Sequence, residues 1–191
     1  MRKYENYHVL QKILLDMKKI SQTEIQNLMA LHQRGLDDDV ISKASSLVKE
    51  HPEEIILFNL LGVSYERKGS LKNAAEAYKN ALNINPNIPE MNFNLGAILF
   101  SENKVEEAIQ FYEKSIQLNN NFPEAYFNLG IALQSMGRFD EAIQCYQKAI
   151  QIQPGFFEAI TNMGTIMQLQ GHLDEAAEFF KKSLSIREDG R

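Results

Sequence analysis

The stretch Tyr126-Phe127-Asn128-Leu129-Gly130 recurs along this chain at a fixed period of 34 residues. Its other copies are FNLLG at 58–62, NFNLG at 92–96 and ITNMG at 160–164. In every copy an alanine follows twelve residues after the glycine, and an aromatic residue follows four residues later. Self-similarity at a fixed period of about 20 to 50 residues is typical of repeat architectures. Four copies in unbroken register therefore predict a stacked array of repeats.

Each copy predicts two helices. Tyr126, Leu129, Gly130 and Leu133 have the i, i+3, i+4, i+7 spacing of one helical face. Gly137 is expected to end that helix in a left-handed conformation, and Pro154 to stop the second helix. The second helix would bury Phe139, Ala142, Ile143, Tyr146, Ala149 and Ile150. The small Gly and Ala columns let the helices approach closely, and the aromatic residues fill the gaps.

A fifth, degenerate copy precedes these four, with Glu24 and Asn27 where large apolar residues belong. Ser21 and Glu24 have the spacing of a capping box, so a helix is expected to begin there. Residues 1–20 are predicted to form an amphipathic helix, either a cap or linker on the array, or a basic helix that touches a membrane or a partner. The predicted divisions are 1–20, 21–54, 55–88, 89–122, 123–156 and 157–188.

These columns resemble the signature of the tetratricopeptide repeat family over roughly residues 21–188. In the first full copy the matching residues are Phe58, Leu61, Gly62, Tyr65, Ala74, Tyr78 and Pro86. Asn92, Asn120 and Glu188 depart from it. The resemblance implies an all-α, right-handed superhelical solenoid of antiparallel helix pairs, and a scaffold that binds other proteins.

The charge and composition of the chain exclude some classes of partner. The formal net charge of -5 and pI of about 5.4 would repel nucleic acid. Residues 1–20 alone carry a net charge of +3. The single cysteine, Cys145, cannot form an intramolecular disulfide, and no apolar run suits a membrane span. We therefore expect a cytoplasmic protein that binds no nucleic acid and has no membrane span.

Catalytic groups are not clustered in the sequence. His8, His32, His51 and His172 are scattered over the repeats without metal-ligand spacing, and no histidine is placed to activate Cys145. Asp37-Asp38-Asp39 is expected to open a helix, where carboxylates complement the helix dipole. We expect no enzyme, no metal and no cofactor.

The predicted binding surface is the concave wall, formed by the non-core faces of the first helices. Glutamate and asparagine recur on it at the 34-residue period. Asparagine amides can pair with a peptide backbone, or they can bond within their own repeat, and both interpretations stay open. The predicted peptide-binding residues are Glu90, Phe93, Asn94, Ala97, Glu124, Phe127, Asn128, Ile131, Glu158, Thr161, Asn162 and Thr165.

The asparagine column also resembles the inner surface of the repeat domain of O-GlcNAc transferases and of bacterial repeat-transferase proteins. The leading hypothesis is a scaffold for an extended polar or basic segment of another polypeptide. The alternative is the N-terminal recruiting part of a larger transferase. At the C-terminal end, Phe180 and Leu184 lack a following helix, so we expect them to be exposed or to mediate self-association.

Overall fold

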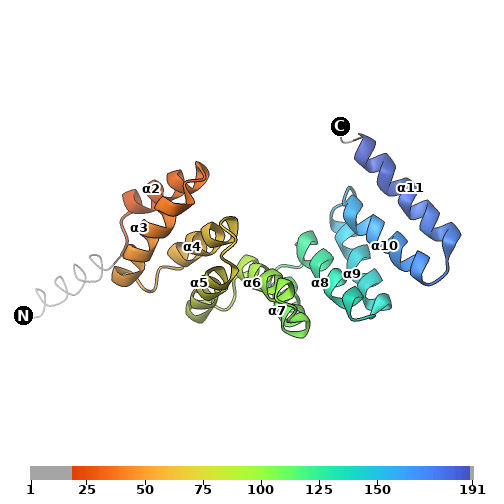
Figure 1. Cartoon of the computed structure of the whole chain (residues 1–191), viewed down its shortest axis with the longest axis horizontal. Helices are drawn as coiled ribbons and strands as arrows, with labels where there is room; N and C mark the ends of the chain where they lie inside the picture. The colour runs from red at the N-terminus through yellow and green to blue at the C-terminus, as the bar shows by residue number, and fades with distance from the viewer. Residues whose placement is uncertain (1–18, 190–191) are drawn as a thin grey trace, which may run out of the picture. The chain divides into compact units, whose positions relative to one another are not determined.

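The computed structural model describes residues 19–189, and within that range it contains α-helices and no strands (Figure 1). The predicted all-α fold of antiparallel helix pairs is confirmed. The helices are α2 (Gln22–Gln33), α3 (Asp37–Glu50), α4 (Ile55–Arg67), α5 (Leu71–Ile84), α6 (Pro89–Ser101), α7 (Val105–Leu118), α8 (Pro123–Ser135), α9 (Phe139–Ile152), α10 (Phe157–Leu169) and α11 (Leu173–Asp189).

The helices belong to two compact units. Unit 1 ends at Pro86 and contains α2–α5, and unit 2 begins at Asn87 and contains α6–α11. In both units each first helix packs on the second helix of its own pair, as in α4 with α5 and α10 with α11. Each second helix then packs on the next first helix within its unit. All the predicted peptide-binding residues lie in unit 2.

Unit 1 is built around an apolar cluster that includes Ile20, Leu28, Val40 and Ala44. The predicted capping box is confirmed, because Glu24 N–H donates to Ser21 Oγ at 3.2 Å and Ser21 N–H donates to the Glu24 carboxylate at 3.0 Å. The helix therefore begins where the sequence indicates. Asn27 is exposed and Glu24 is half-buried, so this first pair tolerates the two polar residues of the degenerate copy.

The acidic run of residues 37–39 opens α3, as predicted. Asp37 forms an ion pair with Arg67 at 3.4 Å, and Asp38 forms one with Lys68 at 2.8 Å. These carboxylates face the positive end of the helix dipole and link α3 to α4. Within residues 19–189 no three acidic, histidine or cysteine side chains gather as a metal site.

The glycine column allows close contact within each pair. A Cβ on Gly62 would lie 2.5 Å from Cε1 of Tyr78, and one on Gly96 would lie 2.9 Å from Cε1 of Tyr112. The aromatic rings therefore lie directly against the glycine backbone. Tyr78 is fully buried, so its ring has little room to move aside.

The first helices end in the predicted left-handed residue. Gly137 has φ 73°, and Arg138 N–H donates to Leu133 O at 3.0 Å, which is the pattern of a Schellman motif. Gly35, Gly69 and Gly171 also have positive φ. After α6 the position is held by Asn103, with φ 62°, so one turn lacks the glycine that relieves this conformation.

Most of the predicted N-terminal helix, residues 1–20, lies outside the described residues. Ile20, which is described, is buried in the cluster of unit 1. Across residues 19–189 no helix is both long and apolar enough to cross a bilayer.

Candidate protein-binding surface

An exposed acidic column runs through the first helices of unit 2. Glu90, Glu124 and Glu158 each lie in the first turn of a helix, on α6, α8 and α10 respectively. All three are exposed, and none takes part in the ion pairs of the described residues. Their carboxylates complement the positive helix ends, and they remain available to a basic partner.

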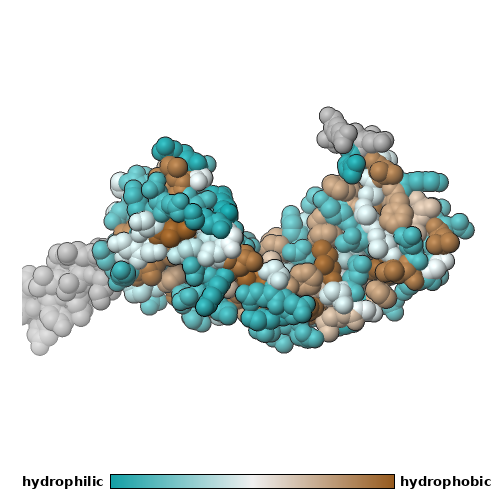
Figure 2. Space-filling model, viewed as in Figure 1, coloured by the Kyte–Doolittle hydropathy of each residue, from teal (hydrophilic) through white to brown (hydrophobic). Residues whose placement is uncertain are grey.

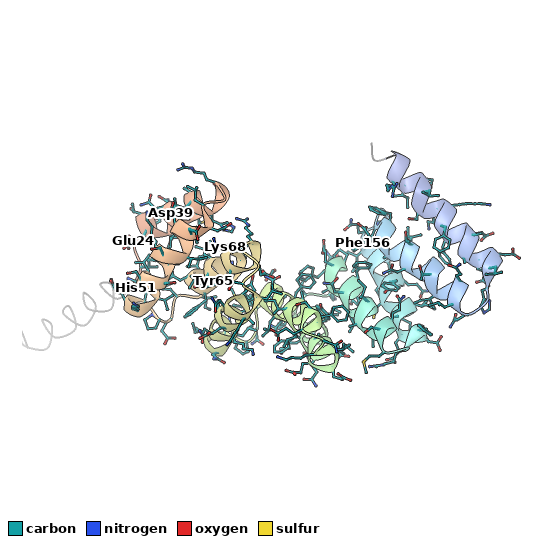
Figure 3. All side chains as sticks on the ribbon, in the orientation of Figure 1. Glu24, Asp39, His51, Tyr65, Lys68 and Phe156 are labelled. Carbon is teal, nitrogen blue, oxygen red and sulfur yellow. The ribbon has the colours of Figure 1, made fainter. Side chains whose placement is uncertain are left out.

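The predicted phenylalanines of this wall have structural contacts. The ring of Phe93 lies 4.9 Å from that of Phe122, and the ring of Phe127 lies 4.8 Å from that of Phe156, centroid to centroid. Phe156 is the N-cap residue of α10 and lies between α8 and α10 in Figure 3. Each phenylalanine is thus half-buried under a ring from the following repeat.

Two of the three predicted asparagines bond tyrosines of the preceding repeat. Asn162 Nδ2 donates to Tyr146 Oη at 3.3 Å, and the side chain of Asn128 is hydrogen-bonded to Tyr112. Tyr146 Oη donates in turn to Gln134 Oε1 at 2.7 Å. Burial raises the pKa of both tyrosines to about 12, so the hydroxyls stay protonated and can donate. The asparagines therefore have a role in stacking the repeats.

The remaining members of the predicted set are half-buried: Asn94 and Ala97 on α6, Ile131 on α8, and Thr161 and Thr165 on α10. Thr165 Oγ1 donates to Thr161 O at 3.1 Å. The wall thus has exposed glutamates at the helix N-termini. Beside them lies a half-buried surface of polar and apolar side chains.

The C-terminal pair encloses a hollow of about 430 Å³. It joins three predicted wall residues, Glu158, Thr161 and Asn162, to the predicted self-association residues Phe180 and Leu184. Leu184 is 52% exposed, as expected. Phe180 is only partly exposed, because its ring lies against Gly164, so the expected exposure holds for Leu184 and not fully for Phe180.

Cys145 has the environment of a packed thiol. It is half-buried on α9, and burial, followed by the charges of Glu141 and Glu113, raises its pKa to about 11. Because the thiolate is the nucleophile, this environment suppresses reactivity near neutral pH. Among the other candidates, the ring of His32 on α2 lies 3.4–3.5 Å from the Arg67 guanidinium and belongs to the α2–α4 contact.

Three features of the wall were missing from the sequence prediction: the rings of Phe122 and Phe156, the tyrosine bonds, and the hollow residues Phe157, Ser183 and Arg187. A signal was present for the first two. Phe122 and Phe156 are 34 residues apart, and Asn128 and Asn162 each follow a column tyrosine by sixteen residues. The hollow depends on how α10 and α11 pack, which no periodicity specifies.

Comparison with known proteins gives a consistent assignment. Sequence profiles for the tetratricopeptide repeat match residues 123–156 and 145–178, and a profile described as TPR repeat matches 62–101 and 96–137. The crystal structure of MamA is 30% identical in sequence, with a TM-score of 0.80 over 84% of this chain and 94% of that one. No curated protein matches the chain significantly.

Two further solved structures share the fold alone. YrrB, described as a TPR protein with an unusual peptide-binding site, is 21% identical with a TM-score of 0.78, over 94% of this chain and 92% of that one. MamA from Desulfovibrio magneticus RS-1 is 17% identical with a TM-score of 0.82, over 90% of this chain and 98% of that one.

Proposed function

Because this chain belongs to the tetratricopeptide repeat family, a family of protein-interaction scaffolds, we propose that unit 2 is a non-catalytic binding module for an extended polypeptide segment. The segment lies along the first helices α6, α8 and α10, and it carries basic residues. The observation that carries the proposal is the exposed acidic column Glu90, Glu124 and Glu158.

The charge pattern supports a basic partner. Stacking requires the buried columns, but it does not require an acidic residue at one exposed position of three successive first helices. Lysine or arginine side chains spaced along an extended segment would meet one carboxylate per repeat. Such charges at a solvent-exposed edge act mainly on the association rate and on selectivity.

The asparagines support binding of a backbone. A carboxamide has two N–H donors and an oxygen that can accept twice, so the bond from Asn162 to Tyr146 does not use its full capacity. The tyrosine holds the amide in one orientation at no cost to the partner. A pre-oriented amide loses less conformational entropy on binding than a free one. The structural and the binding interpretations of this column are therefore compatible.

A charge-matched pair of variants tests the proposal. The probe is a peptide of alternating lysine and serine, titrated calorimetrically at low and at physiological salt. The test variant replaces Glu90, Glu124 and Glu158 by Gln. The control replaces Glu106, Asp140 and Asp174 by the corresponding amides; these exposed acids lie in the first turns of α7, α9 and α11. Both variants change the net charge equally.

We expect at least a tenfold loss of affinity in the test variant and a smaller salt dependence. The control should retain the wild-type affinity within about twofold. Equal losses in the two variants would mean that the peptide responds only to net charge, and the proposal would be wrong.

The alternative is that this chain recruits substrates for a transferase domain. It rests on the resemblance of the Asn94, Asn128 and Asn162 column to O-GlcNAc transferase repeats, and it would use the same wall. Detection of a transferase sequence after Arg191 in the natural reading frame would favour it. YrrB, whose description includes a peptide-binding site, lends support to peptide binding in either case.

A second contact surface is proposed at the C-terminal end, where the sequence predicts self-association through Phe180 and Leu184. The exposure of Leu184 supports a contact there. Figure 2 shows hydrophobic surface over α11.

A further inference from the structure

The hollow at the C-terminal end corresponds to a position that is filled in the two preceding repeats. In the α6–α7 pair, the ring of Phe122 covers Phe93 at 4.9 Å. In the α8–α9 pair, the ring of Phe156 covers Phe127 at 4.8 Å. Both covering rings are N-cap residues of the next first helix, α8 and α10 respectively. We call each such position a ring seat.

The ring seat of the α10–α11 pair is the hollow itself. Thr161 and Phe180 line it at the positions that Phe127 and Tyr146 hold one repeat earlier. The next ring would come from residue 190, which is glycine. At that position the chain therefore has no side chain with which to fill its last ring seat.

The last ring seat also differs in chemistry from the other two. Thr161 Oγ1 and Ser183 Oγ lie 2.6 Å apart, and both hydroxyls reach the carbonyl of Phe157, at 2.9 and 3.2 Å. Thr161 is smaller than Phe93 and Phe127, which hold the same position in the other two seats, so the last seat is deeper. Ser183 is only 7% exposed, and its oxygen keeps acceptor capacity beside the hollow.

We propose that this last ring seat binds a partner polypeptide through a tryptophan or tyrosine at the N-terminus of an α-helix. The aromatic ring would fill the hollow over Phe157 and Phe180, and its N–H or O–H would donate to the Thr161–Ser183 hydroxyl pair. The helix would continue beside α11, as α10 packs beside α9. Leu184 and Arg187 line the hollow and would contact the incoming helix.

A second copy of the chain fits this seat less well. On α10 the residues that face the preceding pair include Ile160 and Met163, which are 1% and 5% exposed. The equivalent positions on α2, the first helix of the described array, hold Glu24 and Asn27. Stacking α2 on the apolar hollow would remove both polar side chains from water, the Glu24 carboxylate with only its capping-box bonds to Ser21, and this burial is unfavourable.

The probe is a synthetic peptide with the sequence of residues 155–169, in which tryptophan replaces Phe156, with a lysine tail for solubility. It reproduces the segment that fills the preceding ring seat. The chain contains no tryptophan, so peptide fluorescence reports binding without background. The matched control peptide has alanine at the same position. Its binding is measured by its ability to displace the tryptophan peptide.

We expect a saturable blue shift for the tryptophan peptide and at least tenfold weaker binding for the alanine peptide. Thr161→Phe, which fills the hollow, and Leu184→Lys, at an exposed edge of it, should each weaken binding at least tenfold. Leu169→Lys, at a side chain that is 65% exposed and outside the hollow, should have no effect. Circular dichroism checks that each variant is folded.

Equal binding of the two peptides, or unchanged binding to Leu184→Lys, would overturn the proposal even if Thr161→Phe failed to fold. Absence of peptide binding would also overturn the proposal, and if Leu184→Lys then abolishes self-association of the chain, the seat would be assigned to a second copy. The peptide-binding wall is tested through Glu90, Glu124 and Glu158, of which Glu158 also lines the hollow. The two proposals can still fail separately, because the lysine-serine peptide has no aromatic residue to fill the ring seat and Leu184→Lys leaves the three glutamates in place.

Discussion

The ring of Tyr146 occupies the space that a side chain on Gly130 would need, since a Cβ there would lie 2.5 Å from Cε1 of the ring. Tyr146 is fully buried and is fixed by bonds to Gln134 and Asn162. The same contact recurs between Gly164 and Phe180, where the distance is 2.8 Å. This column therefore sets how closely the two helices of a pair approach.

Replacing Gly130 by alanine is expected to destabilise the fold by about 1–3 kcal/mol, because overpacking outweighs the gain of about 1 kcal/mol in helix propensity. Replacement by leucine should cost more. Urea unfolding measures both effects. In a Tyr146→Leu background the penalty of the alanine should shrink, and an unchanged midpoint for Gly130→Ala would show that the ring moves aside freely.

Asn103 is the second site where backbone geometry makes a prediction. Its φ of 62° suits glycine, which holds the same position after α2, α4, α8 and α10. Asn103→Gly should stabilise unit 2 by about 0.5–1 kcal/mol, and the reverse change Gly137→Asn should destabilise it by a similar amount. Thermal unfolding measures both effects, and the two opposite substitutions serve as controls for each other. A destabilised Asn103→Gly would mean that the asparagine side chain contributes a bond of its own.

Alkaline pH is expected to weaken the fold. Burial raises the pKa of Cys145 to about 11 and those of Tyr112 and Tyr146 to about 12. The unfolded chain loses these protons at lower pH than the folded chain, so their contribution is complete below about pH 9 and is lost as pH rises through 11 to 12. Urea unfolding at pH 7, 9 and 11 measures the trend.

The raised pKa of the Cys145 thiol predicts that this residue reacts slowly with a thiolate-specific reagent at pH 8 until the chain is unfolded. Fast reaction of the folded protein at that pH would contradict the buried environment.

Association through the C-terminal end is expected to depend on Leu184 more than on Phe180, since only Leu184 is largely exposed. Leu184→Lys should reduce any self-association seen by sedimentation at high concentration, without loss of helix content. Phe180→Glu should instead lower stability, because the ring lies against Gly164. Identical sedimentation of wild type and Leu184→Lys would show that this end has no role in self-association.

The sequence predicted the helix pairs well because the pattern that repeats is the one that packing requires. Gly130, Ala142 and Tyr146 recur because each is needed for the contact inside one pair, and Ser21 and Gly137 mark helix ends through local backbone bonds. These features are local or periodic, so one sequence is sufficient to find them.

The contacts between neighbouring pairs were harder to predict. Phe93 was assigned to the binding surface because it lies opposite the core stripe, but a ring from the next repeat covers it. Asn162 likewise bonds a tyrosine sixteen residues away. Such contacts depend on the angle between successive pairs. The glutamate column and the asparagine column of one wall can therefore have different roles, and a single sequence does not distinguish these roles.

The proposed partner is a basic segment that lies along the first helices of unit 2. The most direct measurement is photo-crosslinking of a lysine-serine peptide that carries a benzophenone group, followed by mass spectrometry of the labelled residues. We expect labels on α6, α8 and α10, near Glu90, Glu124 and Glu158, and their loss when these three are changed to Gln. Labels confined to α7, α9 and α11 would contradict it.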